Sequence, residues 1–96
     1  MINTKQRAAL RAMANQLEPI IHIGKAGITD HLVTQVDDAL TARELIKGTV
    51  QENAEYTAKQ ALHILCERVC AEPVQAIGRK FVLYRRNHEK PKIEFE

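Results

Sequence analysis

Segments with the apolar spacing of a helix alternate along this chain with short runs of β-branched residues. Side chains return to one face about every 3.6 residues in a helix and every second residue in a strand, so the alternation restricts the chain to an α/β fold. The helical pattern predicts helices over residues 4–16, 29–43 and 53–70. The β-rich runs predict strands over residues 19–24, 44–52, 73–77 and 80–85.

The predicted order, α-β-α-β-α-β-β, gives a two-layer α/β fold with a mixed four-stranded sheet. A helix between two consecutive strands favours a right-handed crossover and a parallel pair, as expected around the helix 29–43. Gly78 and its neighbours separate the last two runs so briefly that these should form an antiparallel hairpin. The 96 residues fit one domain, 1–96, and the polar, proline-interrupted stretch 86–96 predicts a mobile tail.

The helix 29–43 and the strand that follows it have the clearest patterns. Thr29 is a favourable N-cap, and Asp30 lies in the first turn, where the helix dipole favours an anion. Residues alternate in the strand 44–52, with one face holding Ile46, Gly48 and Val50 and the other holding Leu45, Lys47 and Thr49. The helix 53–70 has an apolar stripe that comprises Ala58, Leu62, Leu65, Cys66 and Val69.

Charge is distributed unevenly along the chain, although the net charge is only +2. Residues 1–27 hold four basic residues and one acidic, residues 28–78 hold four basic and eight acidic, and residues 79–96 hold six basic and three acidic. Two basic ends favour an anionic polymer such as a nucleic acid as the partner. A solvated surface of uneven charge is the alternative explanation.

The first residues lack the apolar stretch of a signal peptide, and no run approaches the length that spans a membrane. We therefore expect a cytoplasmic protein with no membrane partner. Cys66 and Cys70 lie four residues apart in a helical pattern, where the side-chain directions are poor for a disulfide. Two reduced thiols agree with the same compartment.

The most informative stretch is a G-x-x-G loop, Gly24-Lys25-Ala26-Gly27, between a predicted strand and a predicted helix. Two glycines permit a tight turn and let the backbone approach a ligand closely. The helix that begins at Thr29 offers unpaired N–H groups and a partial positive charge, to which Lys25 adds a full charge. This combination predicts a phosphate site, as in RNA-binding modules that clamp the backbone with such a loop. A tight strand-to-helix turn without a ligand is the alternative.

A second candidate surface surrounds the last predicted strand and consists of Arg79, Lys80, Tyr84, Arg85 and Arg86. Basic groups beside an aromatic ring suit phosphate contacts combined with base stacking. The first predicted helix adds Lys5, Arg7 and Arg11. The alternative is an edge strand whose basic residues prevent aggregation.

The sequence shows no convincing catalytic constellation. The chain contains no serine, and its four histidines are scattered. His63, Cys66 and Cys70 have helical spacing, but a fourth zinc ligand is not evident and Cys66 continues the apolar stripe. The triphosphate-binding loop and the dinucleotide-binding fingerprint are absent as well. We therefore expect no enzyme, no metal, no cofactor and no small-molecule substrate.

Three stretches of the sequence, in this order, resemble the CRM domain (chloroplast RNA splicing and ribosome maturation) in its stand-alone bacterial, YhbY-type form. They are residues 17–29, which include the G-x-x-G loop, residues 44–47 and residues 75–85. The resemblance extends over almost the whole chain apart from its tail. It implies a fold like that of the C-terminal domain of translation initiation factor three. It also implies association with precursors of the large ribosomal subunit in bacteria and with group II introns in plants.

By this resemblance, Gly24, Lys25, Ala26 and Gly27 form an RNA-binding loop comparable to that of KH domains. The matching basic surface includes Lys5, Arg7, Arg79, Lys80, Arg85 and Arg86. We therefore expect a factor that docks on ribosomal RNA during assembly of the large subunit. The competing hypothesis is a protein-interaction adaptor with incidental RNA affinity, in which Asp37, Asp38 and Glu44 of the acidic middle helix meet a basic protein.

Overall fold

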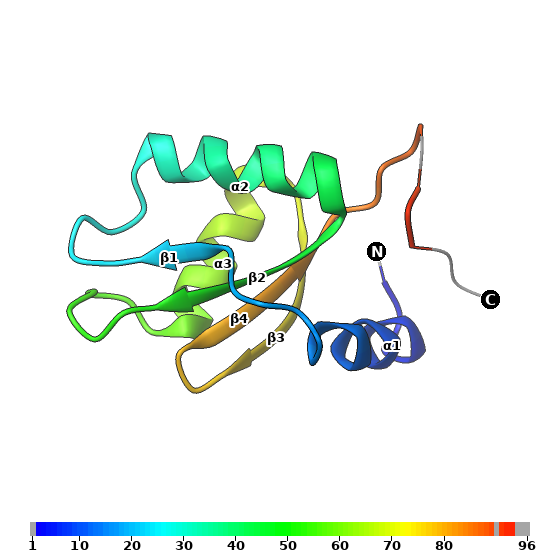
Figure 1. Cartoon of the computed structure of the whole chain (residues 1–96), viewed down its shortest axis with the longest axis horizontal. Coiled ribbons are helices and arrows are strands. Elements are labelled where there is room, and N and C mark those ends of the chain that lie inside the picture. The colour runs from blue at the N-terminus through cyan, green and yellow to red at the C-terminus, as the bar shows by residue number, and fades with distance from the viewer. Residues whose placement is uncertain (1, 90, 94–96) are drawn as a thin grey trace.

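The computed structural model describes residues 2–89 and 91–93 and contains the predicted elements in the predicted order (Figure 1). The helices are α1 (Thr4–Ala14), α2 (Asp30–Arg43) and α3 (Ala58–Val69). The strands are β1 (Ile21–Ile23), β2 (Leu45–Val50), β3 (Glu72–Ile77) and β4 (Lys80–Tyr84). The predicted α/β class is therefore confirmed. None of the described helices combines the length and the apolar character that crossing a membrane requires.

The sheet has the strand order β1-β2-β4-β3. β1 and β2 pair in parallel, with α2 as their connection, whereas β4 pairs antiparallel with both β2 and β3. The predicted parallel pair and the predicted terminal hairpin are both present. Because β4 lies inside the sheet, its side chains from Phe81 to Tyr84 are buried on both faces.

The two faces of the sheet carry separate apolar clusters. α2 and α3 cover one face, where their apolar stripes enclose strand residues such as Ile23, Ile46 and Phe81. α1 lies against the other face, where Leu10 clusters with Leu45 and with residues of β3 and β4. The alternation predicted for β2 is thereby confirmed, because Leu45 and Ile46 enter different clusters. The position of α1 on the second face was not predicted from the sequence.

The third helix begins at Ala58 rather than at residue 53, because a capping box fixes its start. The Thr57 hydroxyl accepts a hydrogen bond from the backbone N–H of Gln60 at 3.1 Å, and the Gln60 side chain accepts one from the backbone N–H of Thr57 at 2.9 Å. This reciprocal pair satisfies two donors that a helix start leaves free. Residues 53–57 therefore belong to the loop between β2 and α3.

The predicted tail begins in a segment that contacts a buried carboxylate. Glu44, directly after α2, is fully buried, and it accepts hydrogen bonds from the backbone N–H groups of Asn87 at 2.6 Å, Lys92, and Ile93 at 2.7 Å. Burial raises the pKa of Glu44, but these three hydrogen bonds and the charge of Arg86 outweigh it, so the net pKa is lowered. Residues 90 and 94–96 lie outside the described part, and the mobility of 86–96 stays a prediction.

Candidate functional site

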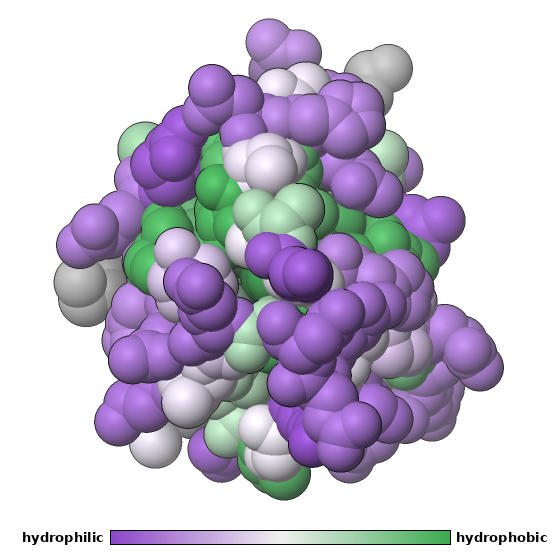
Figure 2. Space-filling view, turned by 90° about the vertical axis from the view of Figure 1, so that its left-hand side faces the viewer, coloured by the Kyte–Doolittle hydropathy of each residue, from purple (hydrophilic) through white to green (hydrophobic). Residues whose placement is uncertain are grey.

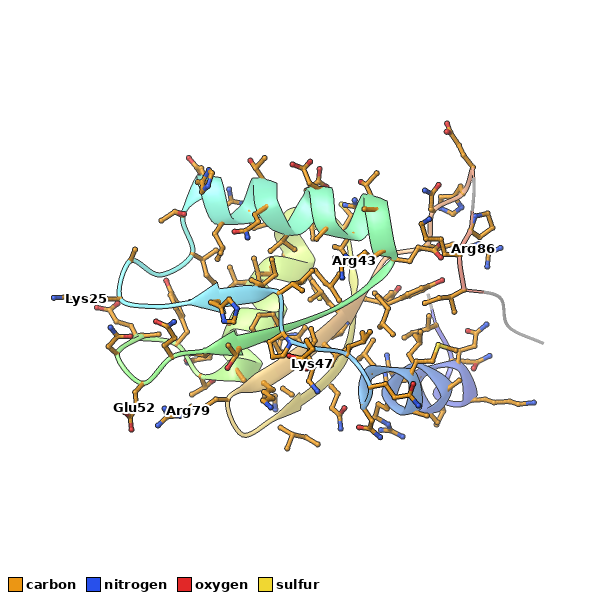
Figure 3. The ribbon with its side chains drawn as sticks, viewed as in Figure 1. Lys25, Arg43, Lys47, Glu52, Arg79 and Arg86 are labelled. Carbon is orange, nitrogen blue, oxygen red and sulfur yellow. The ribbon has the colours of Figure 1, made fainter. Side chains whose placement is uncertain are left out.

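Three loops gather at one end of the molecule, on the left of Figure 1. They are residues 24–29, 51–57 and 78–79, and we call them together the loop end. The backbone N–H of Gln51 donates to the carbonyl of Ile23 at 2.8 Å, and that of Val50 donates to the carbonyl of Arg79 at 2.7 Å. Arg79 also forms an ion pair with Glu52 at 3.2 Å (Figure 3). The G-x-x-G loop and the β3–β4 turn thus form one surface although they are distant in sequence.

The two glycines of the G-x-x-G loop fit its tight geometry for different reasons. The backbone N–H of Gly27 donates to the carbonyl of Gly24 at 3.0 Å and closes a tight turn. Gly27 has a φ of +75°, a left-handed conformation that favours glycine. A Cβ at Gly24 would lie 2.7 Å from Oε1 of Gln51. The end of the Gln51 side chain can move aside, so the backbone conformation at Gly27 is the stronger requirement for glycine.

The loop presents backbone donors that lack protein acceptors. Within the described residues, the N–H groups of Lys25, Ala26, Asp30 and His31 donate to no protein atom. The last two belong to the first turn of α2, which the Thr29 hydroxyl caps, and the partial positive charge of this helix end favours an anion. The side chain of Lys25 is exposed and extends away from the body of the molecule in Figure 3. These donors and this charge can hold phosphate oxygens.

Ion pairs neutralise part of the charge around the loop. Asp30 pairs with Arg68 of α3 at 3.2 Å, and Arg79 pairs with Glu52. Such exposed pairs contribute at most about 1 kcal/mol, so a phosphate can compete for the cations. Lys25 takes part in no ion pair with another described residue. Figure 2 faces this end and shows apolar surface between hydrophilic side chains, a mixture that suits both bases and phosphates.

A second polar surface lies beside α1, on the part of the same sheet face that is nearer the loop end. His22, Thr49, Lys80 and Ile77 face one another in register across the four strands, and Lys47 lies two residues before Thr49 on β2. We call these five residues the open face. His22 and Lys80 are exposed, and Ile77 is 65% exposed. Lys47 is half-buried, and its ammonium group donates to the carbonyl of Ala14 in α1 at 3.4 Å, so it is less available than Lys80. His22, Lys47 and Ile77 were not among the residues predicted for the site, although the alternation of the strand 44–52 could have identified Lys47.

The cations predicted on the first helix lie away from the loop end. α1 is at the opposite end of the molecule in Figure 1. Lys5 and Arg11 are exposed there, whereas the half-buried Arg7 donates from Nε to the carbonyl of Pro73 at 3.2 Å. The structure therefore brings Arg79 and Lys80 near the G-x-x-G loop but not the cations of α1.

Two residues predicted to contact RNA have structural roles instead. The side chain of Tyr84 is only 2% exposed and belongs to the cluster under α1, so its ring is not available for base stacking. Arg85 donates to Oδ1 of Asp37 at 2.6 Å, to the Asp37 carbonyl at 3.0 Å, to the carbonyl of Val69 at 2.9 Å and to the Thr41 hydroxyl at 2.9 Å. A guanidinium with these partners fastens β4 to α2 and α3, and phosphate contact by Arg85 is not supported. Arg86 is exposed but lies near Glu44, not near the loop end.

Cys66 and Cys70 differ in their surroundings. Cys66 is buried, and burial, with a smaller contribution from Glu72, raises the pKa of its thiol to about 12. Cys70 is exposed and free. Among the described residues, no three His, Cys, Asp or Glu side chains are grouped so that they could hold a metal ion.

Comparisons with known proteins agree with this fold and extend over nearly the whole chain. The model of the CRS1 / YhbY (CRM) domain matches residues 2–85. A Bacillus subtilis protein named "Probable RNA-binding protein YqeI" is 38% identical over 94 residues, which are 98% of this chain and 98% of that protein. A Haemophilus influenzae protein named "RNA-binding protein" is 32% identical over 88 residues, which are 92% of this chain and 89% of that protein. The solution structure of a hypothetical protein from Staphylococcus aureus matches with a TM-score of 0.83 and 40% identity and covers 100% of both chains.

Proposed function

This chain belongs to the CRS1/YhbY (CRM) domain family, and on that premise we propose that it binds RNA through the loop end and the adjoining open face. The observation that carries the proposal is the G-x-x-G loop, whose free backbone donors lie beside Lys25 and the start of α2. The names of the Bacillus subtilis and Haemophilus influenzae relatives support the same partner.

The arrangement suits recognition of the RNA backbone. The N–H groups of Lys25 and Ala26 donate to phosphate oxygens, and the ammonium group of Lys25 supplies a full charge. On the open face, the exposed Lys80 contacts a phosphate further along the RNA. Contacts of this kind follow the shape of the backbone and carry little sequence information. The affinity should therefore fall steeply as the salt concentration rises.

The RNA that we favour is ribosomal RNA in precursors of the large ribosomal subunit, bound in the cytoplasm. Membership in the CRM family supports this choice, since the resemblance of residues 17–29, 44–47 and 75–85 implies such a partner. A factor of this kind acts by binding and needs no catalytic group, cofactor or small-molecule substrate.

The alternative, a protein-interaction adaptor, receives less support from the structure. Of the three acidic residues that it requires, Glu44 is buried and bound by the backbone N–H groups of Asn87, Lys92 and Ile93. Asp37 is engaged by Arg85 at 2.6 Å. Asp38 remains exposed. One carboxylate is a poor basis for an acidic docking surface, so RNA binding is the function we propose.

The test of RNA binding by the loop compares two variants, each of which loses one exposed positive charge. One charge lies in the loop before α2, and the other lies in α2 itself. Lys25→Gln acts at the loop end, and Arg43→Gln acts at the far end of α2 (Figure 3). Binding of protein-free ribosomal RNA is measured on filters over a range of salt concentrations. Loss of one phosphate contact in Lys25→Gln should reduce the slope of log K against log salt by about 0.7 to 0.9, whereas Arg43→Gln should keep the wild-type slope. Equal effects of both changes would show that the loop has no special role, and failure of the wild type to retain RNA would refute RNA binding itself.

A further inference from the structure

The G-x-x-G loop lies against the ring of Tyr56. A Cβ at Gly27 would be 3.3 Å from Cε2 of Tyr56, so the ring borders the loop directly. Tyr56 belongs to the β2–α3 loop and is half-buried at the edge of the larger apolar cluster. Among the aromatic residues that the structure describes, Phe81 and Tyr84 are buried. Tyr56 is thus the described aromatic residue with an accessible ring.

Tyr56 also lines a hollow on the exposed side of α3. The hollow has a volume of about 360 Å³ and is lined by Tyr56, Lys59, Gln60, His63 and Ile64. This volume falls within the range of roughly 300 to 1,000 Å³ that small-ligand sites occupy. Tyr56 and Ile64 provide apolar surface, and the exposed side chains of Lys59 and His63, one helical turn apart, provide polar groups beside it.

We propose that the hollow receives one unpaired RNA base, which stacks on Tyr56 while its neighbouring phosphate lies on the G-x-x-G loop. The inference rests on the proposed function and adds to it the class of RNA. An aromatic ring offers a stacking surface to any base, and Lys59 attracts the adjoining backbone. A continuous duplex cannot present a base in this way, because its bases are stacked and paired. The partner is therefore a loop, a bulge or a single-stranded segment.

The first experiment compares Tyr56→Leu with Tyr56→Phe in the full chain. Leucine retains apolar contact with the cluster but cannot stack, whereas phenylalanine keeps the ring. The probes are a short oligouridylate and an abasic strand with the same number of phosphates. Tyr56→Leu should weaken binding of oligouridylate about tenfold or more without changing the salt slope, and Tyr56→Phe should bind within about twofold of the wild type. Neither variant should alter binding of the abasic strand.

A second measurement does not depend on the folding of the leucine variant. The chain has no tryptophan and two tyrosines, so Tyr84→Phe leaves Tyr56 as its reporter of tyrosine fluorescence. Oligouridylate should quench this emission, and the abasic strand should leave it unchanged. Unchanged emission, or unchanged affinity in a folded Tyr56→Leu protein, overturns the stacking role while RNA binding by the wild type still stands. If the wild type binds no RNA, the proposed function fails together with this inference.

Discussion

Two variants, Gly27→Asp and Gly27→Asn, have side chains of nearly equal shape but different charge. Comparing them should separate the effect of charge on RNA binding from the effect of loop geometry. Asp and Asn both add a Cβ that would lie 3.3 Å from Cε2 of Tyr56, and both must adopt the φ of +75°. Asn and Asp tolerate this left-handed conformation better than other side chains with a Cβ. The two variants therefore share the strain, and they differ in one negative charge beside the expected phosphate.

The size of the difference follows from Coulomb's law. Two unit charges about 4 Å apart interact by about 1 kcal/mol in water and by about 4 kcal/mol at the effective dielectric constant near a protein surface. Because Lys25 and Ala26 are exposed, the lower part of this range applies. A repulsion of about 1 to 2 kcal/mol makes Gly27→Asp bind RNA about five- to thirtyfold more weakly than Gly27→Asn.

The free energy of unfolding should not follow the RNA affinity of these two variants. Position 27 lies just before α2, where a carboxylate interacts favourably with the helix dipole by about 0.3 to 1 kcal/mol. Gly27→Asp should therefore unfold at the same urea concentration as Gly27→Asn or at a higher one, while it binds more weakly. Filter binding at fixed salt measures the affinity, and circular dichroism during urea unfolding measures the stability. Equal affinities of the two folded variants would refute phosphate binding by the loop.

Two further predictions concern groups outside the loop. Glu44→Gln should lower the free energy of unfolding by about 2 to 4 kcal/mol, because the N–H groups of Asn87, Lys92 and Ile93 lose a charged acceptor. Since the pKa of Glu44 in the folded protein is below the ordinary value of a glutamate, its contribution is present above that ordinary value and is lost as the pH falls through the lowered pKa. Urea unfolding as a function of pH checks this, and a variant that loses stability in acid as steeply as the wild type would contradict it. Burial raises the pKa of Cys66 to about 12, whereas Cys70 is exposed, so iodoacetamide should alkylate Cys70 first. Peptide mass spectrometry measures the labelling, and equal labelling of both thiols in the folded protein would contradict this expectation.

Features that depend on neighbours in the sequence were predicted well. The order of the elements follows from apolar periodicity, and the alternation in β2 correctly assigned Leu45 and Ile46 to different faces. The start of α3 was predicted too early, because the capping box of Thr57 and Gln60 is a local signal that the apolar stripe alone does not include. The G-x-x-G loop could be located because it is contiguous in the chain.

The surface around that loop could not be assembled in the same way. Arg85 and Arg86 are adjacent in sequence, yet the side chain of Arg85 is fixed by Asp37, Val69 and Thr41 while Arg86 is exposed. Tyr84 has the aromatic ring expected of a stacking residue, but it belongs to β4, which lies inside the sheet, and the side chain of Tyr84 is therefore buried. Which residues face solvent depends on strand order, and strand order depends on contacts between distant segments.

The sequence by itself determined the local structure of this protein: the periodicity of its helices and strands, the turn at Gly24 to Gly27 and the family to which these stretches correspond. These properties are encoded in residues only a few positions apart. Tertiary structure decided that Lys25, Tyr56 and Arg79 lie at one end and that the cations of α1 lie at the other. The physical reason is that apolar burial draws distant segments together without regard to their polar side chains, so the packed core decides which charges become neighbours.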